Sequence, residues 1–124
     1  MNKPVFERDM DLVRAILVWA ENGGAKEMRP NSDGVALCYH VKIAKEADLI
    51  DGAGDLFHNP RTGGWEPGLL HVKMLTWKGQ DFLAAVRSDT VWNHIKAKAK
   101  EYALPALLEV MRAYAVSCVT GTQE

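Results

Sequence analysis

Histidine and cysteine are the side chains in this sequence that bind metal ions most readily, but their spacing does not suit a metal site. None falls in an H-E-x-x-H segment or in a Cys/His pair at zinc-finger spacing. Within a predicted helix, Cys38 and His40 point to different faces. We therefore expect no metal ion and no other cofactor, and both cysteines should be free thiols in a reducing compartment. The residues concerned are His40, His58, His71, His94, Cys38 and Cys118.

Serine and cysteine also lack the surroundings that covalent catalysis needs. No serine lies in a G-x-S-x-G turn, and Cys38 shares no motif with a general base. The glycines do not form a phosphate-binding loop between a strand and a helix. The sequence therefore predicts a protein that is not an enzyme.

The charge of the chain bears on nucleic-acid binding. The formal net charge is −1, which argues against strong indiscriminate binding to phosphates. The distribution is uneven, because acidic residues exceed basic ones over residues 1–68 and basic residues exceed acidic ones over residues 69–124. A local basic face is thus still compatible with the sequence.

Contact with DNA is the first binding chemistry that the residues suggest. A helix over residues 39–48 would expose polar side chains, as a recognition helix does in the major groove. Arg61 lies in a hairpin loop that would reach a phosphate or the minor groove, and Lys96 lies on a later helix. The alternative is an ordinary solvated face on which Glu46 and Asp48 offset the lysines. The candidate DNA-binding residues are Tyr39, His40, Lys42, Lys45, Arg61 and Lys96.

Contact with protein is the second binding chemistry. Trp65 lies in a glycine-rich loop, residues 59–67, that we expect to be exposed. Trp65 either contacts a partner or folds back over the hairpin. An amphipathic helix over about residues 106–119 either binds a partner, forms a homodimer or closes the core of the monomer. The candidate partner-binding residues are Trp65, Leu107, Met111 and Tyr114.

Helical periodicity and capping residues predict the elements that hold these side chains. A first helix covers residues 9–21 and ends at Asn22-Gly23-Gly24. Residues 25–32 form a connection that includes at most a short edge strand. Ser32 or Asp33 then caps a second helix that runs to about Asp48. Its buried stripe contains Leu37, Cys38, Val41, Ala44 and Ala47.

Residues 51–75 have the turn formers and the alternation of a β-hairpin with a long loop. In its second strand, residues 69–75, one face carries Leu70, Val72 and Met74. Thr76 caps a third helix to about residue 87, and a fourth follows over about residues 91–102. We expect the tryptophans of three helices to pack in the core: Trp19, Trp77 and Trp92.

This order predicts an α+β, mainly helical fold, namely a winged-helix domain with a β-hairpin wing and extra C-terminal helices. One domain covers residues 1–124, with a core of about 8–87 and a C-terminal extension of about 89–119. The usual three-helix core has little room, because about twenty residues separate Pro30 from Ile50. Its second helix is either a single turn near residues 32–36 or missing.

Several separated segments resemble one family. They are Arg-Asp-Met-Asp-Leu-Val-Arg at 8–14, Tyr-His at 39–40, Leu-Thr-Trp-Lys-Gly at 75–79 and Ala-Val-Arg-Ser-Asp-Thr-Val-Trp-Asn at 85–93. The family comprises short phage- and prophage-encoded proteins catalogued as a domain of unknown function. The resemblance spans roughly residues 8–100 and implies a winged-helix-like fold and a phage context, but no activity. Gln80 stands where the resemblance implies a histidine, and Asp48 stands where winged-helix proteins often have glycine.

Two functions remain open from the sequence. The first is a phage-derived transcriptional regulator that binds DNA through the helix over residues 39–48 and the loop over residues 59–67, as a dimer. The second is a protein-interaction module or phage inhibitor that binds a host protein or nuclease. In both cases we expect a cytoplasmic protein of the bacterial host cell, with no membrane partner, because the chain has no apolar run of spanning length.

Overall fold

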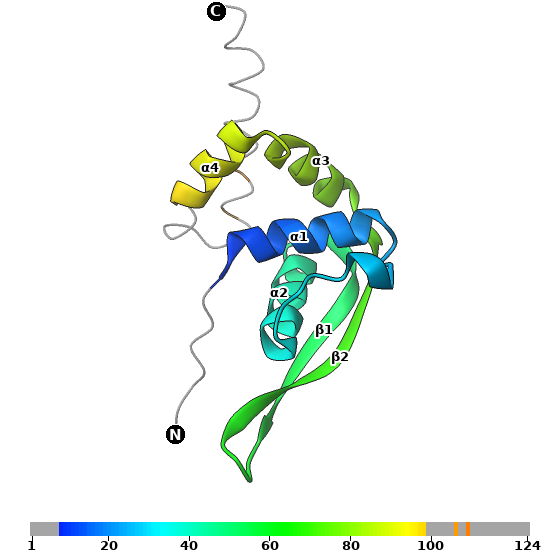
Figure 1. Ribbon diagram of the computed structural model, residues 1–124, viewed down its shortest axis with the longest axis vertical. Coiled ribbons are helices and arrows are strands. Elements are labelled where there is room, and N and C mark those ends of the chain that lie inside the picture. Colours follow the sequence, from blue (N-terminus) through cyan, green and yellow to red (C-terminus); the bar gives the residue numbers. More distant parts are fainter. Residues whose placement is uncertain (1–7, 99–105, 107–108, 110–124) are drawn as a thin grey trace, which may run out of the picture.

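The computed structural model describes residues 8–98, 106 and 109. Within them the fold is α+β, with four α-helices, one short 3-10 helix and a two-stranded antiparallel sheet. The predicted helix over residues 106–119 lies almost entirely outside these residues, as do its Leu107, Met111 and Tyr114. Figure 1 shows the helices at one end and a long twisted hairpin that projects beyond them. The elements are α1 (Met10–Glu21), η1 (Lys26–Met28), α2 (Gly34–Glu46), β1 (Ile50–Asn59), β2 (Gly64–Leu75), α3 (Trp77–Val86) and α4 (Asp89–Lys98).

The capping residues place α1 as the sequence predicts. The carboxylate of Asp9 accepts hydrogen bonds from the backbone N–H groups of Asp11 and Leu12, so it satisfies donors that the first turn leaves unpaired. At the other end Gly23 takes a φ of 71°, which glycine adopts without strain. The N–H of Gly24 then bonds the carbonyl of Trp19 and closes the helix.

Helix α2 begins and ends close to the predicted residues. Asp33 is its cap and accepts from the N–H groups of Val35 and Ala36. The helix ends in a Schellman turn, in which the N–H of Leu49 bonds the carbonyl of Ala44. The residue that makes this turn is Asp48, with a φ of 64°. This left-handed conformation is the reason that glycine suits the position.

The connection between α1 and α2 differs from the expectation. Residues 25–32 do not contain the short edge strand, because Lys26–Met28 wind into the 3-10 helix η1. The single turn expected near residues 32–36 is instead the start of α2. A three-residue 3-10 helix therefore stands in the chain where a winged-helix core would have its second helix.

The hairpin is longer and its loop shorter than the sequence predicts. The ladder runs from Ile50 opposite Leu75 to Asn59 opposite Gly64, so most of residues 59–67 belongs to strands. A register shift between Asp51 and Gly52 places Lys73 in a bulge. Because of this extra residue, Val72 and Leu75 both face the core while Met74 is 53 % exposed. The predicted shared face of Leu70, Val72 and Met74 is therefore wrong.

The core lies between α1, α2, the base of the hairpin and the two later helices. Trp19 and Trp92 are buried in it, as expected. Trp77 is not, because it occupies the outer side of α3 and is 84 % exposed. The inward side of α3 carries Phe82, Leu83 and Val86, and the side chain of Thr76 caps its start.

The left-handed residue of the Schellman turn gives a stability prediction. Asp48→Gly should raise the free energy of unfolding by up to about 1 kcal/mol, because glycine relieves the steric cost of a Cβ at positive φ. Asp48→Ala, which keeps the Cβ and loses the short polar side chain that tolerates this conformation, should lower it. Urea denaturation measures both changes, provided that the variants and the parent have the same dependence of the free energy of unfolding on urea concentration. A glycine variant less stable than the parent would contradict this account.

Candidate partner-binding surface

The exposed side of α2 carries charges of both signs. Lys42 forms an ion pair with Glu46, one turn further along the same helix. Lys45 is exposed and has no ion-pair partner among the described residues, whereas Tyr39 is half-buried. Asp48 is exposed just after the helix. The helix thus presents a mixed surface at the position expected for recognition.

His40 is not on that surface, contrary to the sequence prediction. Its ring is 2 % exposed and lies between the start of α1 and α2. The Nδ1 atom lies 2.7 Å from the carbonyl oxygen of Ala36, to which it can donate, and Nε2 accepts from the backbone N–H of Asp9 at 2.8 Å. Both nitrogens are used when the imidazole is neutral. His40 therefore joins two helices and is not available for contact with DNA.

The environment of His40 favours its neutral form. Burial lowers the pKa of the imidazole from its ordinary value of 6.5, while the carbonyl of Ala36 and the nearby Asp9 act in the opposite direction. Arg8, close to the ring, also lowers the pKa. A second proton would occupy Nε2 and remove the hydrogen bond from Asp9.

The hairpin tip carries one cation and one half-buried aromatic ring. Arg61 is exposed in the turn, where its backbone N–H donates to the side chain of Asn59. Trp65 lies in β2 opposite His58, with 5.3 Å between the ring centroids. Because Trp65 is neither deeply buried nor fully exposed, its position lies between the two alternatives that the sequence left open.

Lys96 lies apart from the other candidate residues. It belongs to α4, which Figure 1 shows far from the hairpin tip. Its ammonium is 3.3 Å from the carboxylate of Asp11, which also accepts from the indole N–H of Trp92 at 2.8 Å. The hydrogen bond from Trp92 is the main cause that lowers the pKa of Asp11, and Lys96 adds to it. Lys96 thus helps to attach α4 to the start of α1.

The sequence prediction missed the outward face of the hairpin. A Cβ at Gly54 would lie 2.6 Å from the carbonyl oxygen of Cys38, so Gly54 faces α2. The register shifts after Gly54, but Leu56 pairs with Pro67, whose ring lies against Gly34 at the start of α2. Leu56 therefore faces α2, and Phe57, the next residue of the strand, points away from it. Leu69 of β2, next to Leu70 that pairs with Gly54, points the same way. Phe57 is 50 % exposed and Leu69 is 61 % exposed.

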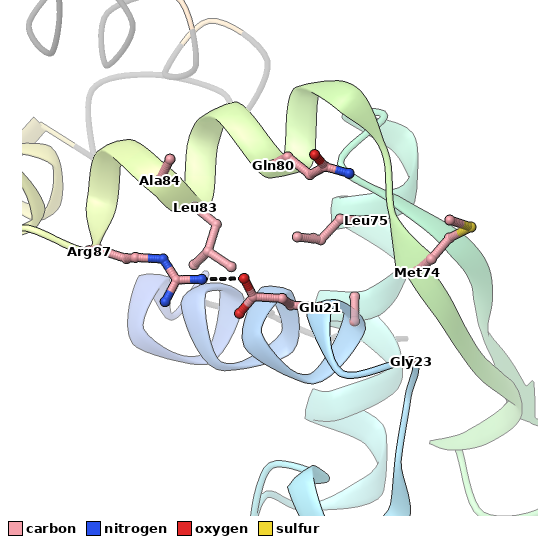
Figure 2. A pocket seen from close by; sticks show the side chains of 9 residues that line it. Glu21, Gly23, Met74, Leu75, Gln80, Leu83, Ala84 and Arg87 are labelled. Carbon is pink, nitrogen blue, oxygen red and sulfur yellow. Dashed lines mark hydrogen bonds and ion pairs between the residues drawn. The ribbon is translucent and has the colours of Figure 1, made fainter.

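A groove opens on another side of the molecule, between the end of α1 and α3. Its volume is about 440 Å³, and Leu75 and Leu83 point into it (Figure 2). At one end the guanidinium of Arg87 forms an ion pair with Glu21, which joins α3 to α1. Met74 and Gln80 also line the groove.

Two further features bear on the class of site. The described part of the chain contains no group of three or more histidine, cysteine, aspartate or glutamate residues that could hold a metal ion. No described helix is both long enough and apolar enough to cross a membrane.

The comparisons with known proteins agree with the resemblance seen in the sequence. A family model described as "Hypothetical protein (DUF2513)" matches residues 7–105. The chain belongs to this family. An "Uncharacterized protein" of Haemophilus influenzae is 28 % identical over 121 residues, which cover 93 % of this chain and 97 % of that protein. No solved structure gives a significant match.

The match confirms the resemblance to a family of unknown function, while the phage origin stays a prediction. The matched residues include every described helix and both strands. Because the DUF2513 model names no activity, the function must be inferred from the surfaces of this fold.

The buried histidine gives a pH prediction. The unfolded chain takes up a proton at His40 near pH 6.5, whereas the folded protein does so only at lower pH. The contribution of His40 to the free energy of unfolding is therefore fully present above pH 6.5. It falls as the pH drops from there toward the lower pKa of the folded state. The slope approaches about 1.4 kcal/mol per pH unit for one proton.

The measurement is urea denaturation between pH 7.5 and pH 5 of the parent and His40→Gln, whose amide can donate and accept but does not titrate. In His40→Gln the free energy of unfolding should depend less steeply on pH than in the parent. His71→Gln, at an exposed histidine of β2, should keep the pH dependence of the parent. Equal slopes for the parent and His40→Gln would refute the assignment.

Proposed function

We propose that this protein is a non-enzymatic binding module that recognises another protein through the outward face of its hairpin. The observation that carries the proposal is the pair of large apolar side chains on that face, Phe57 and Leu69. Large apolar side chains exposed on one face of a hairpin make that face a candidate for contact with a protein. A few central side chains supply most of the affinity of many interfaces, and aromatic rings such as that of Phe57 are enriched there.

The charges around these side chains favour a protein over DNA. The acidic residues of α2, its flanks and the hairpin are Asp33, Glu46, Asp48, Asp51, Asp55 and Glu66, and the basic ones are Lys42, Lys45, Arg61 and Lys73. DNA binding depends on an excess of cations that face phosphates, and this surface has an excess of anions. A partner with an apolar centre and a basic margin would match it, because complementary charges guide association.

The order of the elements supports a winged-helix interpretation of the scaffold. Helix α1, helix α2, a hairpin and helix α3 follow one another as in winged-helix domains, with β1 and β2 as the wing. In this interpretation η1 is a shortened second core helix. If the chain is phage-encoded, as the resemblance implies, its partner is a protein of the bacterial host cytoplasm.

DNA binding is the second candidate, and two side chains favour it. Lys45 on α2 and Arg61 at the hairpin tip are exposed, and neither forms an ion pair with a described residue. They occupy the two elements that contact DNA in winged-helix regulators. Lys42 adds less, since Glu46 neutralises it.

Site-specific photocrosslinking in bacterial cells tests the first candidate. A photoreactive phenylalanine analogue at position 57 or 69 should give the same crosslinked protein, whereas the analogue at the exposed Asn93 of α4 should not. The captured protein is then purified and titrated with the parent chain. Leu69→Thr, which keeps the strand preference and removes the apolar anchor, should weaken binding about tenfold or more.

The contrary result is equally specific. Binding to duplex DNA at low salt that is lost in Lys45→Ala and Arg61→Ala but kept in Leu69→Thr would overturn the protein-binding proposal in favour of DNA. A captured protein that binds Leu69→Thr as tightly as the parent would also overturn it.

A further inference from the structure

The segment Leu75 to Leu83 combines buried residues with four exposed ones, Trp77, Lys78, Gln80 and Asp81, and one of the exposed side chains is a large aromatic ring. Leu75, Phe82 and Leu83 are buried. Thr76 caps α3, and Gly79 permits a close backbone contact. By contrast Trp77 is 84 % exposed, and Gln80 is exposed as well. Neither is needed to hold α3 in place.

Trp77 stands beside the groove between α1 and α3. On α3, residues three, four or seven positions apart lie on one side, so Trp77 shares a side with Gln80 and Ala84. Gln80 and Ala84 line the groove, and the small side chain of Ala84 takes up little of its space. The apolar floor is Leu75 and Leu83 (Figure 2). One surface therefore carries both a projecting aromatic ring and an apolar hollow.

We infer that this surface binds a second copy of the chain, with Trp77 of each copy seated in the groove of the other. A two-fold axis brings identical patches of two copies together. If one patch holds both the projecting ring and the groove, the ring of each copy can enter the groove of the other. An axis beside Gln80 brings the two side-chain amides together, where each can donate to the other and accept from it. Met74, 53 % exposed at the rim of the groove, becomes covered by the same contact.

The chemistry of the groove favours this occupant over a charged ligand. Its two ionic groups, Glu21 and Arg87, are already paired with each other, so the groove offers no net charge. Its lining combines polar groups with the apolar side chains of Leu75 and Leu83, a mixture that suits an indole, which has an apolar ring and one N–H donor. The contact is small, so we expect a dimer that dissociates on dilution.

The dimer leaves the outward face of the hairpin free. In Figure 1, α3 lies toward the end of the molecule opposite the hairpin tip. Phe57 and Leu69 of both copies then remain accessible, and one assembly presents two copies of the proposed partner-binding face. The inference stands on the groove and Trp77, and it does not require the proposed function to be right.

Sedimentation velocity of the full chain, from low to high micromolar concentration, tests the inference. The parent should shift from monomer to dimer as the concentration rises, and Trp77→Ala should stay monomeric. Ala84→Arg, which fills the groove and keeps Trp77, should stay monomeric too. Both positions are exposed, so the thermal midpoint should change little. Leu69→Thr is the matched control at another exposed apolar residue and should dimerise like the parent.

Two outcomes would overturn the inference. The first is a parent that is monomeric over the whole range, and loss of its captured protein partner in Trp77→Ala would then assign the groove to that partner. The second is a dimer that persists in Trp77→Ala and Ala84→Arg, which would assign dimerisation to another surface. Weaker binding of the captured protein to Leu69→Thr is a separate result, which concerns the proposed function and not the dimer.

Discussion

The junction between α2, the hairpin and α3 is the constraint on which the rest of the structure depends. The carbonyl of Leu49 accepts the backbone N–H of Thr76 at 3.0 Å, and the hydroxyl of Thr76 donates to the carbonyl of Asp48. A Cβ at position 79 would lie 1.9 Å from the same Leu49 oxygen, so only glycine allows α3 to lie this close. The left-handed turn at Asp48 starts the hairpin at this point. One small cluster thus sets the direction of β1, the end of β2 and the start of α3.

This junction separates the structural from the exposed residues of the Leu-Thr-Trp-Lys-Gly segment. Leu75, Thr76 and Gly79 are fixed by burial, capping and close approach. Trp77 is directed outward by the helix that Thr76 caps, since it lies opposite the buried side of α3. A large aromatic ring at such a place adds little to the stability of one chain, and this is the observation from which the dimer contact is inferred.

The helices could be predicted from the sequence because their signals are local. Thr76 caps α3 as expected, and Asp33, one of the two expected candidates, caps α2. Asp9, expected only at the start of the first helix, is its cap. The spacing of apolar residues identified the buried sides of these helices. The bulge at Lys73 could not be predicted, since it depends on how β2 meets β1 and the core. The same holds for His40, whose partner on Asp9 is 31 residues away in the chain. A polar residue satisfied by a distant backbone group looks like a surface residue until the fold is known.

Two ion pairs reduce the basic bias of residues 69–124 among the described residues. Arg87 pairs with Glu21 and Lys96 with Asp11, so two cations of this half neutralise carboxylates of α1. Each exposed pair adds little stability, but it cancels the field of both charges beyond a few ångströms. The charges that remain on α2 and the hairpin are mixed in sign. With Arg87 and Lys96 engaged in this way, the proposed partner contact relies more on the apolar side chains of the hairpin than on a field of positive charge.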